Sequence, residues 1–118
     1  MPPFHTKQQK RAQRACTFVS ELTGDNKKDY SQLAKRFPAL VHTCGLAQAV
    51  SFVEAKGKEV GELYLTHLEK VMEMRDNENL GEKSRNSDLT DYQYLTREVI
   101  SSSTWLKRYS EALLGDGK

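Results

Sequence analysis

The sequence predicts an all-α fold, a compact bundle of five to six helices in a single domain that spans residues 1–118. Apolar residues recur at intervals of three and four along most of the chain, as they do on the buried face of a helix. No stretch alternates apolar with polar residues, and no Asn-Gly or Asp-Gly pair lies between β-branched runs, so strands are not expected. A length of 118 residues, 37% apolar and 29% charged, is typical of one folded domain and excludes a disordered chain.

The first helix is expected from about Thr6 to Thr23. One face carries an apolar stripe made of Ala12, Ala15, Cys16, Val19 and Leu22. At about 100° per residue, the opposite face carries Lys7, Lys10 and Arg14. Gly24 is expected to end this helix, and residues 25–28 are expected to form the turn that follows.

The second helix is expected to begin near Asp29, whose carboxylate can cap the free amides of the first turn together with Gln32. Its apolar positions, which form the clearest periodic pattern in the chain, are Tyr30, Leu33, Ala34, Phe37, Leu40, Val41 and Cys44. Pro38 lies inside this pattern. Because proline removes a backbone donor and crowds the preceding turn, it predicts a kink or a break.

Gly45 separates the second helix from a third, over residues 46–56, which Gly57 is expected to close. This segment is apolar nearly all the way round, which predicts a position in the middle of the bundle. A fourth helix is expected over residues 58–75. Its apolar stripe consists of Val60, Leu63, Tyr64, His67, Leu68, Val71 and Met72.

The polar segment 76–88 contains Leu80 as its single apolar residue and is expected to be a flexible loop. A long last helix is expected over residues 89–114, capped by Asp88 and followed by a tail at 115–118. Its predicted inner ridge is formed by Tyr92, Leu95, Val99, Ser103, Leu106, Ser110 and Leu113.

The net charge of +2 is unevenly distributed along the chain. Residues 1–58 contain ten Lys and Arg against four Asp and Glu, or +6, whereas residues 59–118 contain eight against twelve, or −4. A basic half on a nearly neutral protein indicates a face for an acidic partner, and nucleic acid is the first candidate.

The basic side chains fall into three ridges at helical spacing. The first holds Lys7, Lys10 and Arg14; the second Lys28, Lys35 and His42, with Arg36 at its flank; the third Arg97, Ser101, Thr104 and Arg108, with Lys107 beside it. Such side chains suit phosphate oxygens, which they bind without recognising sequence. Any one ridge is equally compatible with an ordinary solvated face. Trp105 turns away from its helix's inner ridge, and we expect it to anchor a protein contact or to cover a helix edge.

No combination of residues indicates catalysis or a metal ion. The histidines His5, His42 and His67 lack zinc-ligand spacing, and Cys16 and Cys44 are interpreted as small buried hydrophobic residues in a reducing compartment. His67 is expected at the edge of the core. The hydroxyl-bearing run 101–104 has no nearby histidine and is interpreted as a ridge where helices pack closely. We therefore expect no enzyme activity, no catalytic residue, no metal ion and no other cofactor.

No apolar run reaches the roughly 20 residues that cross a bilayer, and the N-terminus lacks the pattern of a signal peptide. We therefore expect a cytoplasmic protein without a membrane partner.

Three motifs in a fixed order carry a resemblance to a known family. They are Leu-Ala-x-x-Phe-Pro-Ala-Leu at 33–40, Gly-Leu-x-Gln-Ala-x-x-Phe at 45–52, and Leu-Thr-Arg-Glu with Trp-Leu-Lys-Arg and Glu-Ala within 95–112. The chain resembles the small helical subunit of the type III-B CRISPR effector, the Cmr complex. The matched segments, 33–56 and 95–114, cover 44 of 118 residues, and the first helix and segment 76–88 carry no motif of the family.

This resemblance implies a non-catalytic role in antiviral defence. In that family several copies stack head to tail into a filament beside the backbone subunits that hold the CRISPR RNA, and the target RNA lies between the two filaments. Target cleavage belongs to the backbone subunits, and the large subunit carries the nuclease and cyclising domains. The implied partners are therefore the other Cmr subunits, further copies of the chain, and the CRISPR RNA and target RNA, which are bound without sequence specificity.

Within the matched segments, the strongest candidates for RNA contacts are Lys35, Arg36, Arg97, Lys107 and Arg108, whereas Lys10 and Arg14 depend on charge geometry alone. Two alternatives stay open: the small subunit of a different CRISPR effector class, and a protein-only adaptor whose basic ridges bind acidic helices.

Overall fold

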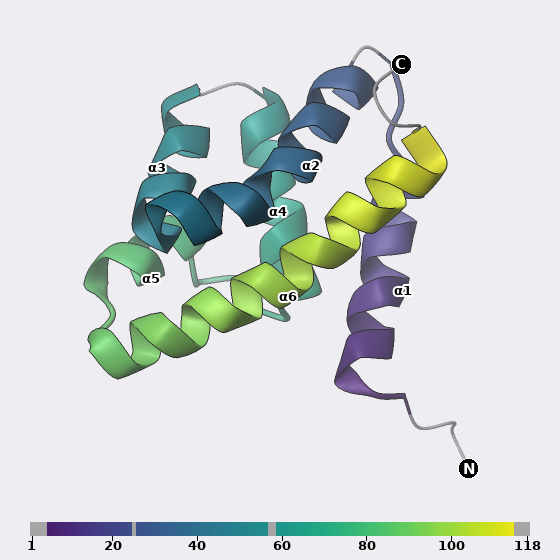
Figure 1. Ribbon diagram of the computed structural model, residues 1–118. Helices are drawn as coiled ribbons and strands as arrows, with labels where there is room; N and C mark the ends of the chain where they lie inside the picture. The colour runs from purple at the N-terminus through teal and green to yellow at the C-terminus, as the bar shows by residue number, and fades with distance from the viewer. Residues whose placement is uncertain (1–4, 25, 57–58, 115–118) are drawn as a thin grey trace.

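Six helices follow one another in the computed structural model, which describes residues 5–24, 26–56 and 59–114 (Figure 1). They are α1 (Lys7–Ser20), α2 (Asn26–Cys44), α3 (Leu46–Lys56), α4 (Glu59–Val71), α5 (Leu80–Asn86) and α6 (Leu89–Leu114). The described residues contain no strand, and none of their helices is long and apolar enough to cross a bilayer. The predicted all-α bundle is confirmed.

Helix α6 organises the bundle. It runs diagonally across the molecule and packs against both α1 and α2 (Figure 1). Its buried face combines Leu95, Val99 and Leu106 with Ser102, Ser103 and Ser110, whose small side chains let the neighbouring helices approach. Helix packing along this ridge is confirmed. Leu113, predicted on the same ridge, is instead 49% exposed, because the helix extends there beyond the core.

The ends of α1 and α6 follow from capping side chains. Thr6 Oγ1 accepts a hydrogen bond from Gln9 N at 3.0 Å, and Gln9 Oε1 accepts one from Thr6 N at 2.8 Å, which completes a capping box. Asp88 Oδ1 accepts from Asp91 N at 2.9 Å and caps α6 as predicted. Helix α1 ends at Ser20, three residues earlier than expected.

Helix α2 corrects the predicted position of its cap and has no break at Pro38. It begins at Asn26, so Asp29 lies within the first turn and is not the cap. It also continues through Pro38 without a break. Pro38 is buried together with Phe37 and Val41, and this packing offsets the loss of one backbone donor.

Helix α3 has the predicted bounds but not the predicted position. It lies at the margin of the bundle next to α5 (Figure 1). Its buried residues, Leu46, Ala49, Val50 and Val53, share one face. Ser51 and Phe52 are exposed, Phe52 by 38%. The run of apolar and small residues therefore did not indicate burial on all sides. The expected closing residue, Gly57, lies outside the described residues, as does the expected tail at 115–118.

The contact between α3 and α4 requires a glycine. A Cβ atom added to Gly61 would lie 3.0 Å from the carbonyl oxygen of Val53, which is backbone and cannot move aside easily. This close approach brings α3 and α4 together on one side of α2.

Segment 76–88 was expected to be a flexible loop, and that prediction is wrong. It contains α5, whose first residue, Leu80, is fully buried. Asn79 Oδ1 accepts from Glu82 N at 3.0 Å, and Glu69 Oε2 accepts from Leu80 N at 2.9 Å. Burial next to α5 raises the pKa of Glu69. The burial of Leu80 and these capping bonds, together with the Lys83–Glu78 ion pair at 2.8 Å, order a segment whose composition suggests a loop.

Helix α4 ends at Val71, four residues before the predicted Arg75. The left-handed backbone of Glu73, with φ of 64°, ends the helical path soon after.

Both cysteines are free. Cys16 is partly buried, but Cys44 is exposed at the end of α2, so its interpretation as a buried hydrophobic residue is wrong.

Candidate nucleic-acid interface

The cations of α1 are largely bound to acidic residues of the same chain. Arg11 is only 2% exposed, and its guanidinium donates to Ser101 Oγ at 2.9 Å and to the Glu98 carboxylate. Lys7 Nζ lies 2.7 Å from the same carboxylate, Glu98 Oε1. Arg11 was not among the residues predicted from the sequence, because it lies beside the apolar stripe and breaks it. Its position in the sequence could have predicted this ion pair, because an arginine on the buried face of a helix requires an acidic partner.

The pKa values in this cluster agree with a bound ion triad. Burial alone would raise the pKa of Glu98, but hydrogen bonds from Lys7 and Arg11 outweigh that cost and lower it. The hydrogen bond with Glu98 in turn raises the pKa of Lys7. The triad joins α1 to α6 and holds Lys7 and Arg11 against one carboxylate, so its net charge is +1.

Arg14, a predicted RNA contact, also has an acidic neighbour. Its Nη1 atom lies 2.7 Å from Glu73 Oε1, an ion pair that lacks the angles of a hydrogen bond. Lys10 differs from both neighbours on its ridge, since it is exposed and forms no ion pair within the described residues. Among the described residues, Lys10 is the one member of the first predicted ridge that has no carboxylate partner.

The outer face of α6, defined here as Arg97, Lys107 and Arg108, is different. Arg97 and Arg108 are exposed and Lys107 is half-buried, and none of the three is paired with a carboxylate in the described part of the chain. The hydroxyls between them are already in use: Ser101 Oγ accepts from Arg11, and Thr104 Oγ1 donates to the Ile100 carbonyl at 2.7 Å. Three cations thus remain available on this face, without the two hydroxyls that the pattern suggested.

Trp105 lies at the seam between α1 and α6. Its Nε1 atom donates to Gln8 Oε1 at 2.7 Å, and its ring stacks on Tyr109 with centroids 6.2 Å apart. The Arg108 guanidinium lies over the same ring, 5.4 Å from its centroid. The side chain thus fastens two helices and helps to orient Arg108, while its predicted contact with another protein stays a prediction.

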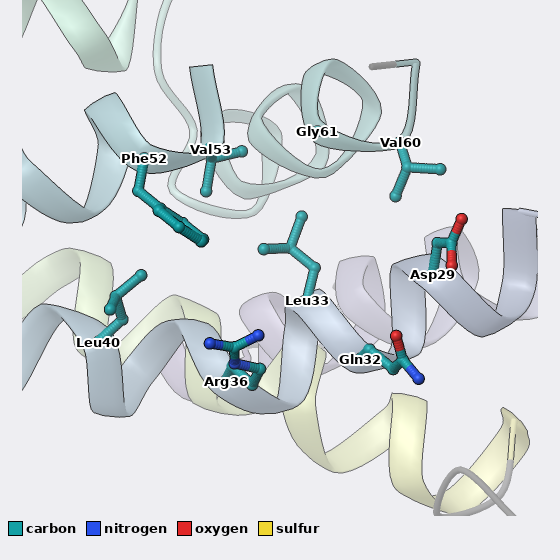
Figure 2. A pocket seen from close by; sticks show the side chains of 9 residues that line it. All are labelled: Asp29, Gln32, Leu33, Arg36, Leu40, Phe52, Val53, Val60 and Gly61. Carbon is teal, nitrogen blue, oxygen red and sulfur yellow. The ribbon is translucent and has the colours of Figure 1, made fainter. Parts of the chain in front are cut away.

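On α2, the two adjacent candidates Lys35 and Arg36 point to different surroundings. Lys35 is half-buried, whereas Arg36 is exposed and lines a groove between α2, α3 and α4 (Figure 2). Neither is paired with a carboxylate among the residues that the structure describes. The sequence pattern placed Lys35 on a ridge and Arg36 at its flank. Consecutive residues diverge by about 100° around a helix, and the packing of α3 and α4 separates the two further.

The groove itself was not predicted. Its volume is about 470 Å³, and its apolar lining comes from three helices that are brought together only by the fold. In Figure 2, Leu33 and Leu40 of α2 face Phe52, Val53 and Val60, with Asp29 near Val60 and Arg36 between the two leucines.

The buried histidine takes no part in either surface. His67 Nδ1 lies 2.7 Å from the Tyr30 hydroxyl, and its ring stacks on Phe18 at 4.5 Å. Burial, together with nearby Lys70, lowers the pKa of His67 to about 4, so it is neutral at pH 7. Its predicted place at the edge of the core is confirmed. Within the described ranges, no three His, Cys, Asp or Glu side chains are grouped so that they could hold a metal ion.

Comparison with known proteins gives a consistent result. Residues 7–113 match the sequence profile of a family described as CRISPR-associated protein (Cas_Cmr5). The chain is 37% identical over 112 residues to the CRISPR system Cmr subunit Cmr5 of Thermus thermophilus, covering 94% of this chain and 98% of that protein. The crystal structure of a CRISPR-associated Cmr5 family protein from the same organism superposes with a TM-score of 0.85 at 35% identity, covering 94% and 99% of the two chains.

Proposed function

Because this chain belongs to the CRISPR-associated Cas_Cmr5 family, we propose that it is the small subunit of an RNA-guided Cmr effector and lines the path of the CRISPR RNA and target RNA duplex. In this role it works with the other Cmr subunits and with further copies of itself. It contributes charge and shape to the complex and leaves target cleavage to other subunits.

The observation that carries the RNA-facing part of this proposal is the outer face of α6. Arg97, Lys107 and Arg108 lie along one helix without acidic partners in the described part of the chain, and Trp105 orients one of them. Unpaired cations at helical spacing attract phosphate oxygens of any sequence, and they release counterions when they do so. Lys35 and Lys10 add two further cations, on α2 and α1, that have no carboxylate partner among the described residues.

A non-catalytic role is favoured by how the candidate groups are used. The hydroxyls of Ser102 and Ser103 are fully buried in the helix packing, and the neutral His67 is hydrogen-bonded to Tyr30 inside the core. A nucleophile needs a base within hydrogen-bond reach and access to substrate. Purified protein incubated with labelled single- and double-stranded RNA and DNA should give no turnover, and cleavage that persists after repeated purification would overturn this part.

The proposal is tested by recovering the protein from its own cells. A tagged chain, purified gently, should bring down the other Cmr subunits together with repeat-containing CRISPR RNAs, and native mass spectrometry should count more than one copy of this chain in each complex. An untagged strain processed in parallel is the control.

Two other outcomes would redirect the assignment. Recovery of subunits from another CRISPR effector class would move the chain to that class. Recovery of protein partners without CRISPR RNA would favour an adaptor whose basic surfaces bind acidic helices.

A further inference from the structure

The groove between α2, α3 and α4 is an apolar surface that the RNA-facing role does not use. Leu33, Leu40 and Val60 are only half-buried there, and Phe52 is 38% exposed. Apolar surface that faces water in this way is a feature of docking sites. We propose that this groove receives the N-terminal end of α6 from a second copy of the chain, with Leu89 entering the groove and Asp91 pairing with Arg36.

Leu89 is suited to enter such a groove. It is 72% exposed, more than any other large apolar side chain that the structure describes. Figure 1 shows that this end of α6 forms a corner of the molecule, beyond α5. The other exposed apolar side chains fit less well: Tyr94 has Lys7 Nζ 6.0 Å from its ring centroid, and Leu113 is less exposed.

The charges on the two surfaces are complementary. Asp88 and Asp91 are both exposed on either side of Leu89, and while Asp88 Oδ1 accepts from Asp91 N, the Asp91 carboxylate has no partner in the described ranges. Arg36 on the groove wall likewise lacks an acidic partner there. Figure 2 places Arg36 between Leu33 and Leu40 and Asp29 at the other end, near Val60. The acidic end of α6 therefore enters near Arg36, away from Asp29.

The two surfaces lie in different parts of one chain, so the contact joins the head of one copy to the tail of the next. A heterologous contact of this type does not need to close and can repeat along a filament. The inference therefore rests on the proposed stacking and names the surfaces that carry it. It also assigns Arg36 to a protein contact, where sequence analysis placed it among the RNA contacts.

The test counts copies of the chain in Cmr complexes assembled from separately purified subunits and CRISPR RNA, by native mass spectrometry. Leu89→Asp and Arg36→Asp should each reduce the mean number of copies at least two-fold. Asp91→Arg should do the same, and the double variant Arg36→Asp/Asp91→Arg should recover most of the wild-type number because the ion pair is restored with reversed polarity.

Matched controls are available on the same two helices. Leu113→Asp changes an exposed leucine at the other end of α6, and Lys27→Asp removes a cation from α2 that lies outside the groove lining and outside the predicted basic ridges, so both should keep the wild-type number. Thermal unfolding of each variant verifies that it is folded.

Each outcome decides between the stacking itself and its proposed surfaces. A wild-type complex with a single copy would overturn both. Several copies in the wild type that persist in Leu89→Asp would overturn only this contact. A lower copy number with Arg36→Asp but not with Leu89→Asp would show that the groove binds a different partner, which also overturns it. If the double variant does not recover the wild-type number of copies, Asp91 and Arg36 do not form an ion pair in the contact, and that part of the proposal is overturned.

Discussion

Helix α1 and the outer face of α6 carry similar cations at helical spacing, yet the fold uses them in opposite ways. Lys7, Arg11 and Arg14 each lie against a carboxylate, Glu98 or Glu73, from elsewhere in the chain. Arg97, Lys107 and Arg108 have no such carboxylate in the described part. The first group stabilises the bundle, and the second remains available to a partner.

The comparison shows why a charge count along the sequence is a weak guide to a charged surface. The +6 of residues 1–58 places the basic face, by count alone, in the first half of the chain. Glu98 and Glu73 from the second half compensate two of the four positive charges on α1, and the unpaired cations of α6 belong to the half whose sum is −4. Ion pairs between distant residues decide which charges remain available to a partner. Arg14 and Glu73 are 59 residues apart in the sequence, and Lys7 and Glu98 are 91 residues apart.

The largest effect is expected from breaking the buried side of this comparison. Arg11→Met removes a cation that is 2% exposed and leaves Glu98 and Ser101 without their buried donor. The free energy of unfolding should fall by about 2–3 kcal/mol, because one partner of a largely buried ion pair is removed. Urea unfolding followed by circular dichroism measures it.

Arg97→Ala is the matched control on the outer face of α6. It should change the free energy of unfolding by less than about 0.5 kcal/mol, as is usual for exposed positions. Equal losses from the two substitutions would mean that the two groups of cations do not differ as described.

A second prediction concerns the other buried basic group. His67 has its pKa lowered to about 4 in the folded chain, against about 6.5 when it is unfolded. The unfolded state therefore binds more protons between these values, so stability is complete above pH 6.5 and is lost as the pH falls toward 4. Between pH 7 and pH 5 the loss should be about 1–2 kcal/mol, after allowance for partial solvation of the ring.

Urea unfolding at the two pH values, with His67→Gln as the comparison, checks this assignment. The glutamine variant is less stable at pH 7, since it lacks the ring stacked on Phe18, but its stability should change less over the same pH interval. A variant with the same pH dependence as the wild type would assign that dependence to other groups.

The smallest effects are expected at the exposed pairs of α1. Arg14→Ala and Lys7→Ala each remove one partner of an ion pair that is open to solvent, so each should cost about 0.2–1 kcal/mol in the free energy of unfolding. Raising the salt concentration should shrink both differences, because exposed charges are screened. Thermal unfolding at low and high salt measures them. A cost above about 2 kcal/mol would contradict this prediction, because it would mean that these pairs stabilise the fold as strongly as the buried Arg11 does.

Much of the fold could be predicted from local sequence. The bounds of α3 and α6, the Asp88 cap and the start of α1 follow from periodicity and from single capping residues. The order in segment 76–88 could not, because it depends on Leu80 entering a core built by distant helices and on a capping bond from Glu69. The same applies to Pro38, which stays helical because its neighbours are buried.

The candidate surfaces could be predicted only in part. Helical spacing located the cations of α6, but it could not show that Arg14 has an acidic neighbour or that Arg36 borders a groove. Both facts depend on which helices lie next to each other. A pattern within one helix does not contain that information.

The central claim is that the outer face of α6, and not the paired cations of α1, attracts the RNA. The most direct test is the salt dependence of target RNA binding by the reassembled complex, compared between the triple variant Arg97→Ala/Lys107→Ala/Arg108→Ala and the double variant Lys7→Ala/Arg14→Ala. The triple variant should reduce the slope of log Kd against log salt by about 1 for each phosphate that is no longer neutralised, equally for targets of different sequence, while the double variant keeps the wild-type slope. A reduced slope in the double variant with an unchanged slope in the triple variant would contradict the claim.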